Sequence, residues 1–196
     1  VKMKKGFNVR FIIPTIFIGV LALTALVLAL TGDLLGTVTL PGNGACSVAG
    51  TFDGTYYITI NAAGLCVGTV IGIYQPPVGG NGAAVLISSK NIVDAANNPI
   101  SISALAWDPN RNKLWGAYED KLYLIDVGDK TLNTDAVATF QFNAGVGGIN
   151  LVDGLAYDGS DDTIYYSPDV NANVYHFSPA GVLLNTVTPK NAAGVA

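Results

Sequence analysis

The sequence predicts an all-β fold that is built from a repeated unit of about 50 residues. Gly, Val, Thr, Ile and Tyr are common, whereas Glu119 is the only glutamate of the chain, and this composition favours strands over helices. An aromatic residue followed by Asp recurs at Phe52, Trp107 and Tyr157, with spacings of 55 and 50 residues. A period of this size is typical of repeat folds whose units bury their apolar faces against one another.

Each repeat predicts an antiparallel pair of strands joined by a tight turn. Small and apolar residues precede the aromatic residue, polar turn residues follow the Asp, and a second apolar run comes next, in segments 47–57, 103–115 and 153–165. An Asp at such a position bonds its own backbone and so favours the turn. The segments Lys121–Asp126 and Asn173–Ser178 are expected to add a third strand to their units.

A second repeat predicts a fourth strand. Gly32–Thr39 recurs as Gly181–Thr188 with six of eight positions identical. Four antiparallel strands in about 50 residues, repeated along the chain, are the pattern of a β-propeller blade. The segment Gln75–Gly82 interrupts the first unit, and we interpret it as a loop inserted before Val85-Leu86-Ile87, which is expected to be a strand of the next blade.

The repeated segments resemble the NHL and YVTN-like propeller repeats. Blades of those families often contain Gly-Leu-Ala, an aromatic residue and Asp, then a polar turn and an apolar strand with Tyr, as in Gly154–Tyr165 here. The resemblance covers most of the chain after residue 32. It implies a propeller fold, and it implies no particular activity because many functions share this fold.

The number of repeats predicts an incomplete propeller. Propellers need about four to eight blades, and only three aromatic-Asp units are present. Gly194-Val195-Ala196 matches Gly154-Leu155-Ala156, yet no aromatic-Asp pair follows it. We therefore expect an open arc of about three blades preceded by an N-terminal hydrophobic helix, with two apolar blade faces that missing blades or self-association would cover.

The N-terminal residues 1–31 form a targeting segment, and residues 32–196 form the partial propeller. Four basic residues precede an uncharged apolar stretch at residues 11–30, which as a helix would span roughly 30 Å, about the thickness of the hydrocarbon core of a bilayer. The segment fits either an uncleaved signal anchor or a cleaved signal peptide, and the sequence leaves both open. Both place the chain after Asp33 outside the cytoplasm, secreted or anchored to the cytoplasmic membrane through residues 11–30.

Charge excludes one class of partner. After residue 32 the chain carries all 14 acidic residues and six basic ones, a balance of about −8. A nucleic acid is therefore excluded as a partner, because there is no basic stripe to release its counterions.

Cys46 and Cys66 are an even pair, as expected in an oxidising compartment. Two strands of separation in one sheet would place them roughly 9.5 Å apart, so a disulfide and two free thiols both stay open.

The sequence offers few candidates for catalytic or metal-binding residues. No nucleophile and base can be paired, and His176, the only histidine, lies in a predicted strand where packing or exposure is expected. Two Cys and one His lack the spacing of a zinc site. The acidic segment Asp158–Asp162 could offer oxygens to calcium, but Asp and Ser are also typical of the hairpin turn that is required there, and we favour the turn.

Asp153 is the single candidate metal ligand. In propellers that resemble gluconolactonases and senescence-marker proteins, an Asp before such a Gly faces the central channel and binds a divalent cation, so the resemblance implies calcium or another divalent cation at Asp153. The equivalent positions of the other repeats hold Val48 and Ser103. The remaining ligands of that family have no counterpart here, and we identify no catalytic or cofactor-binding residue.

Two functions follow from these features. The first is a non-catalytic binding or scaffold module outside the cytoplasm, whose propeller loops or central face hold a protein, a glycan or a small molecule. The alternative is a secreted, metal-dependent propeller hydrolase or lyase that resembles gluconolactonases. Several carboxylates around one channel mouth would favour the alternative, and an apolar or Gly-lined mouth would favour the module.

Overall fold

The structure is a computed structural model that describes residues 37–41, 49–61, 67–146 and 152–190. The described strands belong to one compact unit, Val38–Ala196. The predicted hydrophobic helix of residues 11–30 and both cysteines lie outside the described residues. Within the described ranges, no helix has the length and apolar character needed to cross a membrane.

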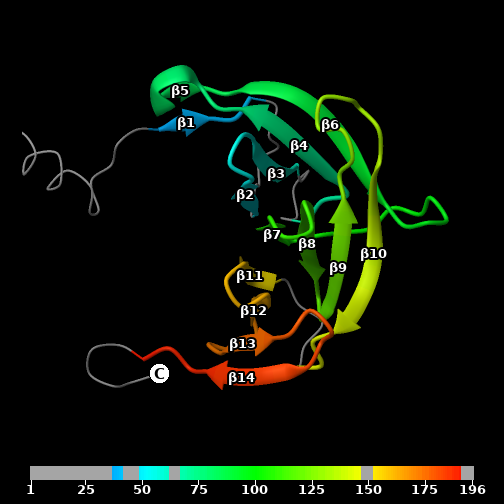
Figure 1. Ribbon diagram of the computed structural model, residues 1–196, viewed down its shortest axis with the longest axis vertical. Helices are drawn as coiled ribbons and strands as arrows, with labels where there is room; N and C mark the ends of the chain where they lie inside the picture. Colours follow the sequence, from blue (N-terminus) through cyan, green and yellow to red (C-terminus); the bar gives the residue numbers. More distant parts are fainter. Residues whose placement is uncertain (1–36, 42–48, 62–66, 147–151, 191–196) are drawn as a thin grey trace, which may run out of the picture. The chain divides into compact units, whose positions relative to one another are not determined.

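Twelve of the strands form three four-stranded units, which we call blades (Figure 1). Blade one consists of β2 (Gly50–Phe52), β3 (Tyr57–Asn61), β4 (Val70–Gln75) and β6 (Val85–Val93). Blade two consists of β7 (Ala104–Asp108), β8 (Lys113–Tyr118), β9 (Lys121–Asp126) and β10 (Ala136–Asn143). Blade three consists of β11 (Val152–Asp158), β12 (Thr163–Pro168), β13 (Val174–Phe177) and β14 (Leu183–Val187).

Neighbouring strands within each blade are antiparallel, as the repeat predicts. The first strands β2, β7 and β11 end at or next to the aromatic-Asp pairs, and β7 contacts both β2 and β11. First strands of successive blades also lie next to one another in a β-propeller. The described residues are thus almost entirely β structure with the architecture of propeller blades.

The aromatic-Asp turns form for the local reason that the sequence predicts. Asp53 Oδ1 accepts hydrogen bonds from the backbone N–H groups of Thr55 at 2.7 Å and Tyr56 at 2.6 Å. Asp158 Oδ1 does the same for Ser160 at 2.8 Å. Each Asp side chain thereby replaces backbone partners that the turn would otherwise leave unpaired.

The strand that begins at Val85 differs from its prediction. β6 pairs antiparallel with β4 from Gln75 opposite Val85 to Val70 opposite Asn91, so it is the fourth strand of blade one and not a strand of the next blade. The inserted segment holds a short 3-10 turn (Val78–Gly80) and β5 (Gly82–Ala83), and then returns the chain to the same sheet. The sheet edge of β4 offers unpaired backbone groups to the chain as it returns, which explains the pairing.

The two segments of the second repeat also differ from one another. Leu183–Val187 is the fourth strand of blade three, antiparallel to β13, as predicted. In the earlier copy, the described strand is β1 (Val38–Thr39), which pairs parallel with β5 at Gly82 and Ala83. Within the described residues, one copy of the repeat therefore forms a blade edge and the other forms a short extension of the insertion.

Two apolar clusters lie between the blades. The first joins blade one to blade two, and its fully buried members include Ile58, Ile73 and Leu114. The second joins blade two to blade three around Trp115, Ile164 and Phe177. Blades one and two also share a continuous sheet, because Ile92 and Val93 of β6 pair parallel with Ala136 and Val137 of β10.

Candidate functional site: the polar clusters between blades

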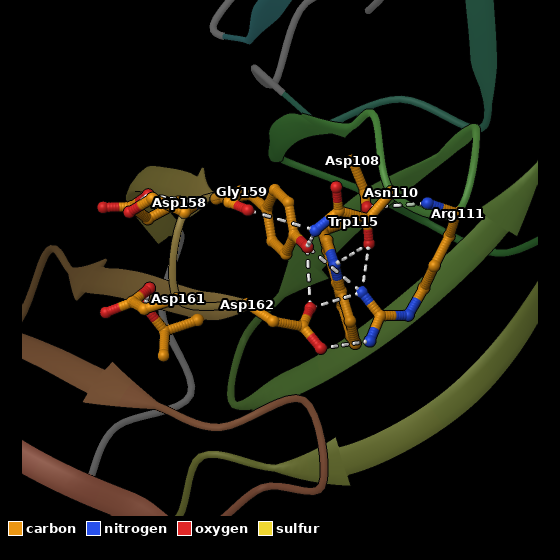
Figure 2. Close-up of polar contacts among 11 residues, drawn as sticks. Asp108, Asn110, Arg111, Trp115, Asp158, Gly159, Asp161 and Asp162 are labelled. Carbon is orange, nitrogen blue, oxygen red and sulfur yellow. Dashed lines mark hydrogen bonds and ion pairs between the residues drawn. The ribbon is translucent and has the colours of Figure 1, made fainter.

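A polar cluster lies where the first turns of blades two and three meet (Figure 2). At its centre is Asp108, whose side chain is 0% exposed. Asp108 Oδ2 accepts hydrogen bonds from Trp115 Nε1 at 3.0 Å and Arg111 Nη1 at 2.8 Å, and Oδ1 accepts one from the Arg111 backbone at 3.0 Å. Both oxygens of this buried carboxylate are thus hydrogen-bonded within blade two.

Arg111 connects this cluster to blade three. Its Nη1 and Nη2 donate to Asp162 Oδ1 at 2.6 Å and Oδ2 at 2.8 Å, the bidentate geometry that guanidinium and carboxylate favour. Asp162 adopts the left-handed backbone conformation, with φ of 59°, at the end of the turn before β12. Few residues other than Gly, Asn and Asp take this conformation readily, so the turn itself points the carboxylate at Arg111.

The hydroxyl of Tyr157 completes the junction. It donates to Asp162 Oδ1 at 2.6 Å and accepts from Asn110 Nδ2 at 2.7 Å. Asn110 also donates to the carbonyl of Gly159 at 3.2 Å, which ties the turn of blade two directly to the turn of blade three. Figure 2 shows Asn110 and Arg111 of blade two facing Gly159 and Asp162 of blade three.

The electrostatics of this cluster fix its protonation states. The hydrogen bonds from Arg111 and then Tyr157 lower the pKa of Asp162 to about 2. Burial, followed by the hydrogen bond to Asp162, raises the pKa of Tyr157 to about 12, and the carboxylates raise the pKa of Arg111. General acid-base catalysis at neutral pH needs a group whose pKa lies near 7. Asp162 and Tyr157 are shifted away from that range, so this arrangement suits a structural tie between the two blades.

A second cluster joins blades one and two. Burial acts to raise the pKa of Asp53, but hydrogen bonds from Lys130, Tyr56 and Thr55 hold it below its ordinary value. Lys130 Nζ binds Asp53 Oδ2 and lies 4.1 Å from the centroid of the Trp107 ring, a cation-π contact. Trp107, the aromatic residue of the first repeat strand of blade two, thus contacts the Lys130–Asp53 pair. In blade three, the equivalent Tyr157 is hydrogen-bonded to Asp162.

Lys90 is the most deeply buried cation of the described residues, with 1% exposure. Its Nζ donates to the carbonyls of Asp129 at 2.8 Å, Leu132 at 2.6 Å and Thr134 at 3.3 Å, and to the Thr134 hydroxyl at 3.1 Å. Burial lowers the pKa of this amine. The ammonium group holds the loop before β10 against β6, beside the place where the two blades share their sheet.

The predicted turn at Asp158–Asp162 is confirmed. Asp158 accepts hydrogen bonds from the backbone and the hydroxyl of Ser160, and the Thr163 hydroxyl donates to Asp161. These carboxylates are therefore engaged with the chain itself. No group of three or more His, Cys, Asp and Glu that could hold a metal ion occurs among the described residues.

Asp153 lies in β11, the first strand of blade three, at an irregularity of the pairing with β12 between Val152 and Gly154. The structure does not describe its side chain, and its assignment as a metal ligand stays a prediction. The equivalent Ser103 is buried, and its hydroxyl accepts a hydrogen bond from the Val152 backbone at 3.1 Å. The other equivalent residue, Val48, lies outside the described residues.

His176 lies in β13 and is half-buried, and the sequence left both packing and exposure open for it. Its ring is stacked on Tyr165 with a centroid distance of 4.3 Å and an interplanar angle of 4°. Its Nε2 is buried and has no hydrogen-bond partner among the described residues. A lone imidazole on an aromatic ring provides neither a metal-ligand set nor a catalytic pair.

Sequence reasoning missed the cations that join the blades, Lys90, Arg111 and Lys130. One signal could have identified Arg111, because it lies 51 residues before Asp162, close to one repeat length. Opposite charges one period apart face one another when successive units stack. Lys130 and Asp53 are separated by 77 residues and carry no such signal.

Comparisons with known proteins find similarity in structure alone. No protein-family model matches the chain, and no curated protein sequence matches it. A chain of hydrazine synthase from Kuenenia stuttgartiensis is 13% identical, with a TM-score of 0.47 over 84% of this chain and 43% of that one. A chain of a nidogen/laminin complex is 15% identical, with a TM-score of 0.41 over 71% of this chain and 48% of that one.

A luciferin-regenerating enzyme is 18% identical, with a TM-score of 0.45 over 72% of this chain and 46% of that one. The protein thus spans less than half the length of each of these three chains. The assignment of propeller blades depends on the strand order and the contacts between blades given above.

Proposed function

We propose that this protein is a binding or scaffold module of β-propeller type that is displayed outside the cytoplasm. One observation carries the proposal: the buried charged groups at both blade junctions bind other groups of the same chain. Asp108 accepts three hydrogen bonds from Arg111 and Trp115, and Lys90 donates to three carbonyls and a hydroxyl. Such groups stabilise a rigid framework, and a rigid framework holds surface loops in place for recognition.

A ligand survey tests the binding role. Because a ligand that binds only the folded state raises the unfolding temperature, we expect at least one class among soluble glycans, peptides and small metabolites to raise the Tm. The same preparations are assayed for lactone hydrolysis with calcium and with EDTA. Turnover that EDTA abolishes, without any Tm shift by a non-hydrolysable ligand, would contradict the module and favour an enzyme.

The location is proposed from the N-terminal segment. The basic residues before residue 11 and the apolar residues 11–30 support export, with the segment either retained as an anchor or cleaved. Membrane fractionation and protease treatment of intact cells test this proposal. Release of the full-length protein by a carbonate wash would contradict the anchor, and protection of residues 38–196 from external protease would contradict export.

A second candidate function rests on the position of Asp153. The residue lies in the first strand of its blade at a pairing irregularity, and such irregularities are common next to active sites. A calcium-dependent hydrolase or lyase would use Asp153 as one ligand of the ion. Calorimetric titration with calcium chloride tests this: binding that Asp153→Asn removes, and that Asp161→Asn leaves unchanged, would favour the enzyme.

A further inference from the structure

A polar cavity of about 230 Å³ lies beside the pairing of β6 with β10. Its walls come from the residue before β4, the end of β6, the connection from β6 to β7 and the residue before β10. The lining residues are Thr69, Asn91, Val93, Asn97, Pro99 and Asp135. The cavity thus belongs to the internal junction of blades one and two.

Backbone hydrogen bonds hold the walls of this cavity. The N–H of Ile92 donates to the carbonyl of Thr69 at 2.7 Å, and the N–H of Ile100 donates to the carbonyl of Ile92 at 2.8 Å. Val93 forms an antiparallel bridge with Pro99. Because these bonds fix the backbone of the lining residues, a ligand does not have to order the site when it binds.

A tight turn in the connection from β6 to β7 positions Asn97. Asp94 Oδ1 accepts hydrogen bonds from the backbone N–H groups of Ala96 and Asn98, both at 2.8 Å. The N–H of Asn97 donates to the carbonyl of Asp94 at 3.0 Å. Asn97 adopts the left-handed backbone conformation, with φ of 66°, which Asn takes more readily than most residues. The turn therefore holds Asn97 at the cavity by contacts that do not use its own amide.

The polar side chains of the cavity offer both donors and acceptors. Asn91 Nδ2 donates to Asp135 Oδ1 at 2.9 Å, which sets the two groups side by side. The side chains of Thr69 and Asn97 make no hydrogen bond with another residue that the structure describes. A hydroxyl and a carboxamide can each donate and accept, so these groups match a ligand that does the same.

The charge of the cavity favours a neutral ligand. Among the six lining residues only Asp135 is ionised near neutral pH, so an anion would meet a carboxylate without a cation in the lining. Burial lowers the pKa of the Lys90 amine, and attraction to the carboxylates of Asp129 and Asp135 acts against that effect. Lys90 thus balances part of the charge of Asp135, which makes the site less attractive to a cation as well.

We propose that this cavity binds one ring of a neutral saccharide, either a free sugar or a unit of a larger glycan. Its hydroxyl groups pair with Asn91, Asn97 and Asp135, and its C–H groups contact Val93 and Pro99. The volume lies below the roughly 300–1,000 Å³ of sites for drug-sized ligands, which suits a single ring. The inference rests on the proposed binding module and assigns it a ligand class. Because the site is open, we expect a Kd of about 1–10 mM.

Saturation-transfer NMR tests the proposal on the full-length chain in octaethylene glycol dodecyl ether, a detergent without sugar. The probes are the methyl glycosides of glucose, galactose, mannose and N-acetylglucosamine, and at least one should bind. Asn97→Gly removes the amide but tolerates the left-handed backbone, and should weaken binding at least about 5-fold. Asn112→Gly is the matched control, because Asn112 is also exposed and left-handed, with φ of 53°, and lies outside the cavity. It should bind like the wild type.

Further probes separate the alternatives. Tighter binding of an oligosaccharide than of its methyl glycoside would identify a glycan as the source, and equal binding would identify a free sugar. If Asn97→Gly alters the circular dichroism spectrum, Thr69→Val repeats the test by removing a hydroxyl while keeping the shape of the side chain. Hydrolysis of a methyl glycoside that Asn97→Gly slows would support the saccharide site and contradict the non-catalytic module.

Three results would overturn the saccharide site. They are no saturation transfer to any saccharide at about 100 mM, equal binding by the wild type and Asn97→Gly, or binding of ethanolamine in place of a sugar that Asp135→Asn abolishes. None of them contradicts the binding module, whose own test is the shift in Tm with ligands of other classes.

Discussion

The two junctions between successive blades differ in the polar contacts that stabilise them. Blades one and two share one hydrogen-bonded sheet through β6 and β10. Lys90 also donates hydrogen bonds to backbone carbonyls of the loop before β10. Blades two and three belong to separate sheets in the described residues, and the polar contact between them is made by side chains around Arg111 and Asp162. Backbone pairing does not depend on particular side chains. Single substitutions of polar residues should therefore weaken the junction of blades two and three more than the junction of blades one and two.

The largest expected effect is that of Asp108→Ala. The change removes the buried acceptor of Arg111 and Trp115 and leaves the indole N–H without a partner, so we expect a loss of about 3–5 kcal/mol in the free energy of unfolding. Urea unfolding followed by tryptophan fluorescence measures it. Asp126→Ala, which breaks the exposed pair with Lys113, is the control and should cost less than about 1 kcal/mol. Equal losses would contradict a special role for Asp108.

Lys90→Met tests the first junction. Met preserves the apolar part of the side chain but removes the ammonium donor from three carbonyls, of which Asp129 keeps the Leu132 N–H, and we expect a loss of about 2–3 kcal/mol. Hydrogen exchange should quicken in the loop 129–134 and remain slow at the pairing of Ile92 with Ala136, because the backbone ladder there does not depend on Lys90. Unchanged exchange in the loop would show that the ammonium group is not what holds it.

A double-mutant cycle on Arg111→Gln and Asp162→Asn sharpens the comparison. Because the pair is bidentate but 30% and 46% exposed at its two ends, we expect a coupling energy of about 1–2 kcal/mol. The coupling should fall when NaCl is raised from 0.1 to 1 M, since the screening length shrinks from about 10 Å to about 3 Å. A coupling of zero at low salt would show that this ion pair does not hold the two blades together, and would leave the apolar packing and the other hydrogen bonds of the junction, such as that of Asn110 with Gly159.

The smallest expected effect is on acid stability. The pKa of Asp162 is lowered to about 2 in the folded state from an ordinary 3.8, so its contribution to stability is full above about pH 4 and is lost as the pH falls through about 2. Asp162→Asn should therefore flatten the dependence of stability on pH between pH 2 and 4. Denaturant midpoints measured across that range would show it, and identical pH profiles would contradict the depressed pKa.

The repeat was predicted well from the sequence because its signals are local. An Asp that bonds the backbone two or three residues ahead fixes each first turn, so Asp53 and Asp158 could be placed without any tertiary contact. The recurrence of Gly181–Thr188 predicted the fourth strand of blade three, although the earlier copy forms the short strand β1 beside the insertion instead. The strand at Val85 was assigned to the wrong blade, because an insertion hides whether a strand returns to its own sheet or starts another.

The sequence by itself determined the number of aromatic-Asp units, the turns that follow them and the alternation of apolar residues along the strands. Only the tertiary structure decided which distant charges meet: Lys130 with Asp53, Arg111 with Asp162, and Lys90 with the carbonyls of a loop some 40 residues away. The physical reason is the distance along the sequence between the residues that interact. A turn is fixed by hydrogen bonds within a few residues, whereas the partner of a cation depends on how whole blades stack, which no short segment encodes.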